Sequence, residues 1–259
     1  MRRTYRGRAL SSRIRPTRAF AESRGRVPSP RGWAAGILLA VCLAAVCACG
    51  SQVGANGVAS ETPTRALERV QAAASDAATV HVSGSVAGPG GPLEIDMELV
   101  RGQGGRGTVS VDGLRAQLVR DAGWVYVKPN HTLLEQLVGP AAAGRLAGRW
   151  LKGPADHGPL QPLASLTNLR AVLHEVLTDH PLTIVGARTI AGHAAVGLRD
   201  PSTGATLYVS ARGNPYPLAL VKPGAGGGTL TFGRWNKEIS LEAPPNPLNI
   251  KAVFALKGL

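Results

Sequence analysis

The sequence contains little cysteine, and all of it lies near the N-terminus. The three cysteines are Cys42, Cys47 and Cys49, so residues 50–259 contain none. A segment without cysteine forms neither a disulfide nor a thiolate metal site. Residues 50–259 must therefore obtain their stability from a hydrophobic core alone.

Known catalytic motifs are also absent. The sequence has no Gly-x-Ser-x-Gly elbow and no His-Glu-x-x-His motif. His174 and His180 are too far apart to share one helix face as a metal pair. The glycine-rich stretch Gly224–Gly228 precedes no helical pattern, which favours a hairpin turn over a phosphate loop. We therefore predict no catalytic residue, no metal and no cofactor; a hydrolase with an unrecognised site is the alternative.

Acidic residues are scarce, 16 against 29 basic ones, and the formal net charge is +13. Ten of the arginines lie in residues 1–32, where Glu22 is the only acid, so the rest of the chain has 19 basic and 15 acidic side chains. Aromatic residues make up 4% of the chain and do not alternate with basic clusters. Nucleic acid is therefore not an expected partner.

What the N-terminus does have is the pattern of a bacterial lipoprotein signal. The basic residues 1–32 precede 15 uncharged residues, 34–48, which are followed by Cys49 and Gly50. A bilayer-spanning helix needs about 20 apolar residues, so this run better suits the apolar region of a signal peptide. We predict cleavage before Cys49 and acylation of Cys49, with chains such as palmitate. The protein is then anchored on the extracytoplasmic face of the cell membrane.

Three alternatives remain for this N-terminus: an uncleaved membrane helix, a cleaved soluble protein, and export by the twin-arginine route through Arg2-Arg3. The predicted organisation is a signal peptide over 1–48, a lipidated flexible tether over 49–63, a domain over 64–245 and a C-terminal tail over 246–259. The 211 residues after the signal suffice for one domain. Their richness in Ala, Gly, Arg and Pro fits an actinobacterial genome.

Two blocks of alternating apolar and polar residues predict strands. The first block runs from Val80 to Lys128 and the second from Leu182 to Glu242. Apolar stripes at helical spacing predict helices over 65–77, 131–138, 140–147 and 162–177. Such strands form an antiparallel sheet with one face in water, and the helices must cover the other. The predicted fold class is α+β: a curved antiparallel sheet, an open half-barrel, with helices packed on its concave face.

This order of elements, together with several local phrases, resembles the mycobacterial lipid-carrying lipoproteins of the LppX, LprA, LprF and LprG type, whose fold is similar to that of the carrier LolA. The matching phrases are Gly123–Lys128, Gly186–Gly192, Ala205–Ser210 and, most specifically, Thr229–Pro245. The resemblance covers about residues 61–245. It implies a large apolar cavity between sheet and helices that binds acylated lipids or glycolipids, and it supplies no catalytic residue.

Apolar, small and aromatic residues near this expected cavity are the ligand-binding candidates. They are Leu133, Leu137, Ala141, Leu146, Trp150, Leu169, Val172, Leu173, Val176, Tyr126 and Tyr208. Small residues of the 140–147 helix would leave room for acyl chains, and Trp150 would meet lipid headgroups. The expected partners are an acylated lipid or glycolipid, the membrane through the lipid anchor, and an envelope transporter. The alternative is a filled core in a lipoprotein that scaffolds or regulates an envelope complex.

Overall fold

A computed structural model describes residues 54–88, 90–176 and 181–255, without the side chains of 174–176. The strands are β1 (Thr79–Gly88), β2 (Gly91–Val100), β3 (Gly104–Val111), β4 (Leu114–Asp121), β5 (Trp124–Pro129), β6 (Leu151–Pro154), β7 (Thr183–Ile190), β8 (His193–Arg199), β9 (Thr206–Ser210), β10 (Pro217–Lys222), β11 (Gly228–Gly233) and β12 (Leu248–Asn249). The α-helices are α1 (Pro63–Asp76), α2 (His131–Val138), α3 (Pro140–Leu146), α4 (Gln161–Leu166), α5 (Leu169–Val176) and α6 (Ile250–Ala255).

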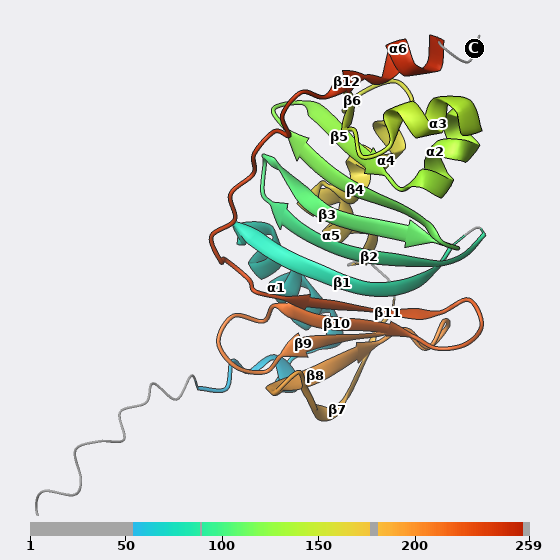
Figure 1. Cartoon of the computed structure of the whole chain (residues 1–259). Coiled ribbons are helices and arrows are strands. Elements are labelled where there is room, and N and C mark those ends of the chain that lie inside the picture. The colour runs from blue at the N-terminus through green and yellow to red at the C-terminus, as the bar shows by residue number, and fades with distance from the viewer. Residues whose placement is uncertain (1–53, 89, 177–180, 256–259) are drawn as a thin grey trace, which may run out of the picture. The chain divides into compact units, whose positions relative to one another are not determined.

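The described strands form one open sheet in the order β12-β6-β5-β4-β3-β2-β1-β11-β10-β9-β8-β7. Neighbouring strands are antiparallel, except that the short β12 runs parallel to β6. The sheet curves, and α1, α4 and α5 lie behind it in Figure 1. The predicted α+β class, a curved antiparallel sheet with helices on its concave face, is confirmed.

Alternation along the strands gives the sheet its apolar inner face. Strand register places Val82, Met97, Gly107, Leu118, Val127 and Leu151 in one row across six strands. All of these side chains except Gly107, which has none, are at least 96% buried. Their sequence neighbours point to the outer face, because successive side chains of a strand alternate. The outer neighbours include Glu98, whose carboxylate pairs with Arg106 at 2.8 Å and with Arg234 at 2.9 Å.

Local signals explain where the helices begin. The Thr62 hydroxyl accepts from the Arg65 amide and Pro63 occupies the first turn, so α1 begins at Pro63, before the predicted start at residue 65. The predicted helix over 162–177 is interrupted between α4 and α5. There the Asn168 side chain accepts from the amides of Arg170 and Ala171 and so starts a new helix.

The segment predicted as a flexible tether is partly docked on the domain. Ala55 bridges to Arg212, and the Asn56 amide group donates to the carbonyls of Ser210 at 2.8 Å and Gly213 at 3.1 Å. Val58, in a 3-10 helix (Val58–Ser60), is fully buried. Residues 55–58 are therefore packed against the domain, whose predicted start is residue 64, because Val58 belongs to the core.

The C-terminal segment also differs from its prediction. Residues 238–242 form no strand; the connection instead follows the outer face, where Arg106 donates to the Ser240 carbonyl at 3.0 Å. The predicted tail, 246–259, contains β12 and α6, and Ile250 and Val253 are buried in the core. β12 and α6 are too short to give a periodic sequence pattern. The sequence therefore did not predict that residues 248–255 belong to the domain.

Burial on β4 gives a first prediction. Leu118→Ala should lower the free energy of unfolding by about 3 kcal/mol, since Leu118 is 1% exposed on the inner face. Its neighbour Val119 faces outward and is half-buried, so Val119→Ala should cost less than about 1 kcal/mol. Urea unfolding of residues 50–259 measures both. Equal losses would contradict the assignment of the two faces.

The turn after β8 gives a prediction about pH. The Asp200 carboxylate accepts from the Ser202 and Thr203 hydroxyls at 2.6 and 2.8 Å. These bonds lower the pKa of Asp200 from 3.8 to about 2. The folded state is thus favoured above pH 4, and that advantage should disappear as the pH falls from about 4 to about 2. Unfolding of Asp200→Asn, followed by circular dichroism, should depend less on pH in this window than unfolding of the wild type.

Candidate functional site

Two adjoining cavities lie between the concave face of the sheet and the helices. The first, about 330 Å³, is enclosed by β2–β6, α2, α4 and α6. The second, about 640 Å³, is enclosed by β1, β2, β10, β11, α4 and α5. Leu93 of β2 and Leu166 of α4 line both cavities. The two cavities are therefore neighbouring compartments of one space under the helices.

The lining of this space is almost entirely aliphatic. Leu163, Val109 and Phe254 are typical of the first compartment; Ile95, Leu220 and Leu230 are typical of the second. Among the described lining residues the polar side chains are Ser110, Ser165 and Lys222, and Lys222 is the one that ionises. An apolar space with few polar groups binds apolar ligands and offers little for chemistry on them.

Short helices leave the space open. The two helices that cover its centre, α4 and α5, have 6 and 8 residues. The Arg120 guanidinium of β4 donates to the Ala164 carbonyl at 3.4 Å and so ties the end of α4 to the sheet. Where β10 connects to β11, the wall of the second compartment consists of Gly226–Gly228, which have no side chains to fill it.

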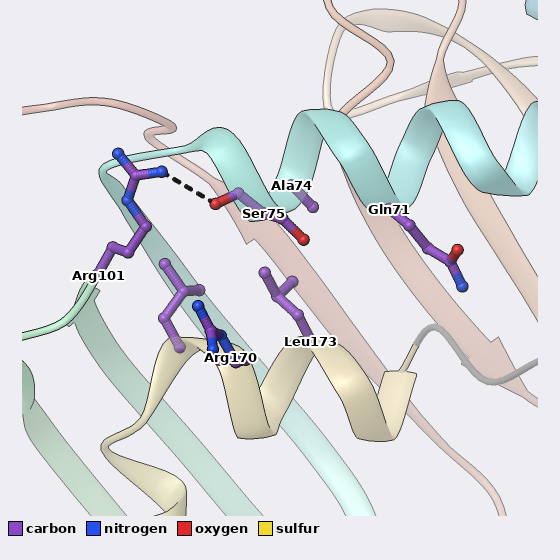
Figure 2. A pocket seen from close by; sticks show the side chains of 7 residues that line it. Gln71, Ala74, Ser75, Arg101, Arg170 and Leu173 are labelled. Atoms are coloured by element: carbon purple, nitrogen blue, oxygen red, sulfur yellow. Dashed lines mark hydrogen bonds between the residues drawn. The ribbon is translucent and has the colours of Figure 1, made fainter.

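Three of the predicted ligand-binding residues line this space. Leu133 and Leu137 of α2 line the first compartment, and Val172 of α5 lines the second. Leu169 and Leu173 lie on another flank of α5, in a separate pocket against α1 (Figure 2).

Other predicted residues lie elsewhere. Leu146 is buried in the core but lines neither compartment. Ala141 is exposed, and its neighbour Ala143 is the residue of α3 that is fully buried. The small residues of α3 therefore pack that helix and do not enlarge the cavity. The side chain of Val176 lies outside the described residues, as does Cys49.

The three aromatic candidates lie on the outer face. Tyr126 alternates with the inward Val125 and Val127. Trp150 lines an outer groove together with Val119. Register decides the position of Tyr126, because a strand residue between two inward neighbours must point outward.

Tyr208 follows the same rule, since it alternates with the inward Leu207 and Val209. On the outer face the Arg188 guanidinium lies 5.9 Å from the centre of its ring. Burial, and secondarily the Asp121 carboxylate, raise the pKa of the Tyr126 phenol.

Most of the lining was not among the predicted site residues. The residues missed include Leu93, Val109, Leu163, Leu166, Leu220 and Phe254. Leu93 and Ile95 alternate with acidic residues along β2. This alternation is the sequence signal that identifies them as inward-facing. Phe254 could not be found in this way, because α6 was not predicted.

Other kinds of site find no support in the part of the chain that the structure describes. It contains no group of three or more His, Cys, Asp or Glu side chains arranged to hold a metal ion. Within the same residues, no helix has the length and apolarity required to cross a bilayer.

Comparisons with known proteins give matches of structure only. No family model and no curated protein sequence matches the chain. Its structure is similar to that of LprF from Mycobacterium bovis, with a TM-score of 0.48 and 17% identity over 70% of this chain and 96% of that chain. It is also similar to the Mycobacterium tuberculosis lipoprotein LppX, with a TM-score of 0.40 and 12% identity over 72% and 98% of the two chains. A third match is MucB in the Pseudomonas aeruginosa MucA/MucB complex, with a TM-score of 0.33 and 20% identity over 70% of this chain and 61% of that chain.

LprF and LppX are thus structural neighbours of the chain as well as members of the lipoprotein group that its sequence resembles.

Leu93 lines both compartments, so a larger side chain at this position tests whether they form one space. Leu93→Trp should reduce binding of a hydrophobic fluorescent dye by residues 50–259 at least about fivefold, because the larger side chain enters both compartments. The matched control Val119→Trp adds the same ring on the outer face and should leave dye binding unchanged. Equal effects of the two substitutions would place the dye elsewhere.

Proposed function

We propose that this protein is a membrane-anchored envelope lipoprotein that binds acylated lipids or glycolipids in the cavity for their transport or presentation. The observation that carries the proposal is an aliphatic space of about 330 Å³ and about 640 Å³ in two adjoining compartments. Ligand pockets commonly measure about 300–1,000 Å³. The space is therefore large enough for a ligand, and its lining suits hydrocarbon.

The energetics favour such a carrier. Exposing a 16-carbon chain to water costs on the order of 12 kcal/mol at about 0.8 kcal/mol per methylene. A lipid that leaves a bilayer therefore needs an apolar enclosure. Side chains such as Ile95, Leu166 and Leu220 supply one between sheet and helices, whereas the groove on the outer face of β1–β3 and β11 offers mainly Ser, Thr and charged groups.

The anchor belongs to the same proposal. Acylated Cys49 would hold the protein on the extracytoplasmic face of the cell membrane, since two acyl chains give stable anchoring. Ala55 and Asn56 are bound to the β9–β10 region. An envelope transporter would deliver or receive the lipid. The residues contribute binding and shielding from water, and the protein is not an enzyme.

One observation favours the second candidate, a scaffold or regulator of an envelope complex. Among the described strands, β7 lies at an end of the sheet order and pairs only with β8. An unpaired strand edge can accept a strand from a partner protein. This function would not require an occupied cavity.

Lipid extraction tests the proposal. Residues 50–259, expressed in a lipid-containing host and purified, should carry about one acylated lipid per molecule, identified by mass spectrometry of the extract. Leu93→Trp should lower this content several-fold, and Val119→Trp should not. A purified protein that carries no lipid and binds no added glycolipid would contradict the lipid-binding function, and a stable protein partner would then favour the scaffold.

A further inference from the structure

A separate pocket of about 290 Å³ lies between α1 and α5, beside the turn that follows β2. Ala74 of α1 and Leu169 and Leu173 of α5 form its apolar floor. Arg101, from the turn, and Arg170, from α5, also line it. Figure 2 shows the two arginines toward the same end of the gap between the helices.

The pocket is distinct from the lipid cavity. Leu169 and Leu173 are the residues of α5 that face it, whereas Ala171 and Val172 of the same helix face the second compartment. The body of α5 therefore separates the two spaces. A ligand of this pocket does not depend on occupation of the cavity.

The charge of this pocket is positive, and no acidic side chain among the described residues neutralises it. None of its described lining residues is acidic. The described ion pairs of arginine involve Arg69, Arg106 and Arg234, and none includes Arg101 or Arg170. The two side chains bring two formal positive charges to the edge of an apolar floor, an arrangement that attracts an anion.

Arg101 is held in place for such a contact. Its Nη1 donates to the Ser75 carbonyl at 3.1 Å, and its backbone amide donates to the Ala78 carbonyl at 2.8 Å. A guanidinium has five N–H donors, so one bond to Ser75 leaves others for a ligand. A side chain that is already oriented loses less conformational freedom on binding.

We propose that the α1–α5 pocket binds a phosphate group, with Arg101 and Arg170 contacting its oxygens. The planar guanidinium matches the oxygens of phosphate in a bidentate way, which a lysine does not. The floor of Ala74, Leu169 and Leu173 would contact the carbon atoms next to a phosphate ester. The phosphate can belong to an amphiphile such as a lipid headgroup or be free in solution.

Binding of three small probes to residues 50–259, measured by calorimetry, tests this site. The probes are hexyl phosphate, inorganic phosphate and hexanol. Arg170→Gln should weaken binding of hexyl phosphate about tenfold, the loss expected for one hydrogen bond to a charged group. Arg145→Gln removes the same charge from the exposed end of α3 and should have no effect.

The probes also separate the two sources of phosphate. Tighter binding of hexyl phosphate than of inorganic phosphate supports an amphiphile, and equal affinities that are both lost in Arg170→Gln support free phosphate. Equal behaviour of Arg170→Gln and Arg145→Gln, or binding of hexanol as tight as that of hexyl phosphate, overturns the proposal. Leu93→Trp should bind hexyl phosphate normally, so failure of this site and failure of the lipid cavity are distinguishable.

Arg101→Lys provides a second variant. It keeps the charge but removes the bidentate fork. We expect weaker binding of hexyl phosphate with an unchanged melting temperature. Unchanged binding would remove Arg101 from the site.

Discussion

The structure depends on a mismatch of length between the sheet and the helices that cover it. Strands β1 and β2 each have 10 residues and therefore span roughly 33 Å, at about 3.3 Å per residue. The helices α4 and α5 have 6 and 8 residues, or roughly 9 and 12 Å at about 1.5 Å per residue. The apolar inner face is thus longer than its cover, and hydrocarbon from another molecule can occupy the part that remains.

The same mismatch divides the interior into a filled end and an open end. Near the longer helix α1, Val70, Val80 and Leu99 are fully buried, and their mutual packing stabilises the fold. Toward the β1–β2 hairpin, Val86 and Leu93 are only half-buried and border the compartments. Under the proposed function, stability and binding would rely on different parts of one inner face, and a lipid would enter or leave without disruption of the filled end.

Much of the fold could be predicted from the sequence, because alternation of period two is a strong signal in strands as long as β1 and β2. The same signal places Tyr126 and Tyr208 on the outer face, whereas their aromatic character, which suggests ligand binding, contains no information about register. The break between α4 and α5 at Asn168 is indicated in the sequence by only one capping residue inside an apolar helical stripe. The two-residue β12 gives no period at all. The cavity depends on distances between elements that are far apart in the chain, which residue patterns do not contain.

A single strand leads from the docked segment around Asn56 to the second compartment. β10 begins at Pro217, beside the region where Asn56 is bound, and ends at Lys222, which lines the second compartment. Its 6 residues span roughly 20 Å. With Cys49 acylated as proposed, the chain from Cys49 to Gly54 adds at most about 17 Å when fully extended. Under the proposed function, a lipid in this compartment would then stay within a few tens of ångströms of the anchoring bilayer, and exchange with that membrane or with a partner beside it would be favoured over transport across a wide aqueous layer.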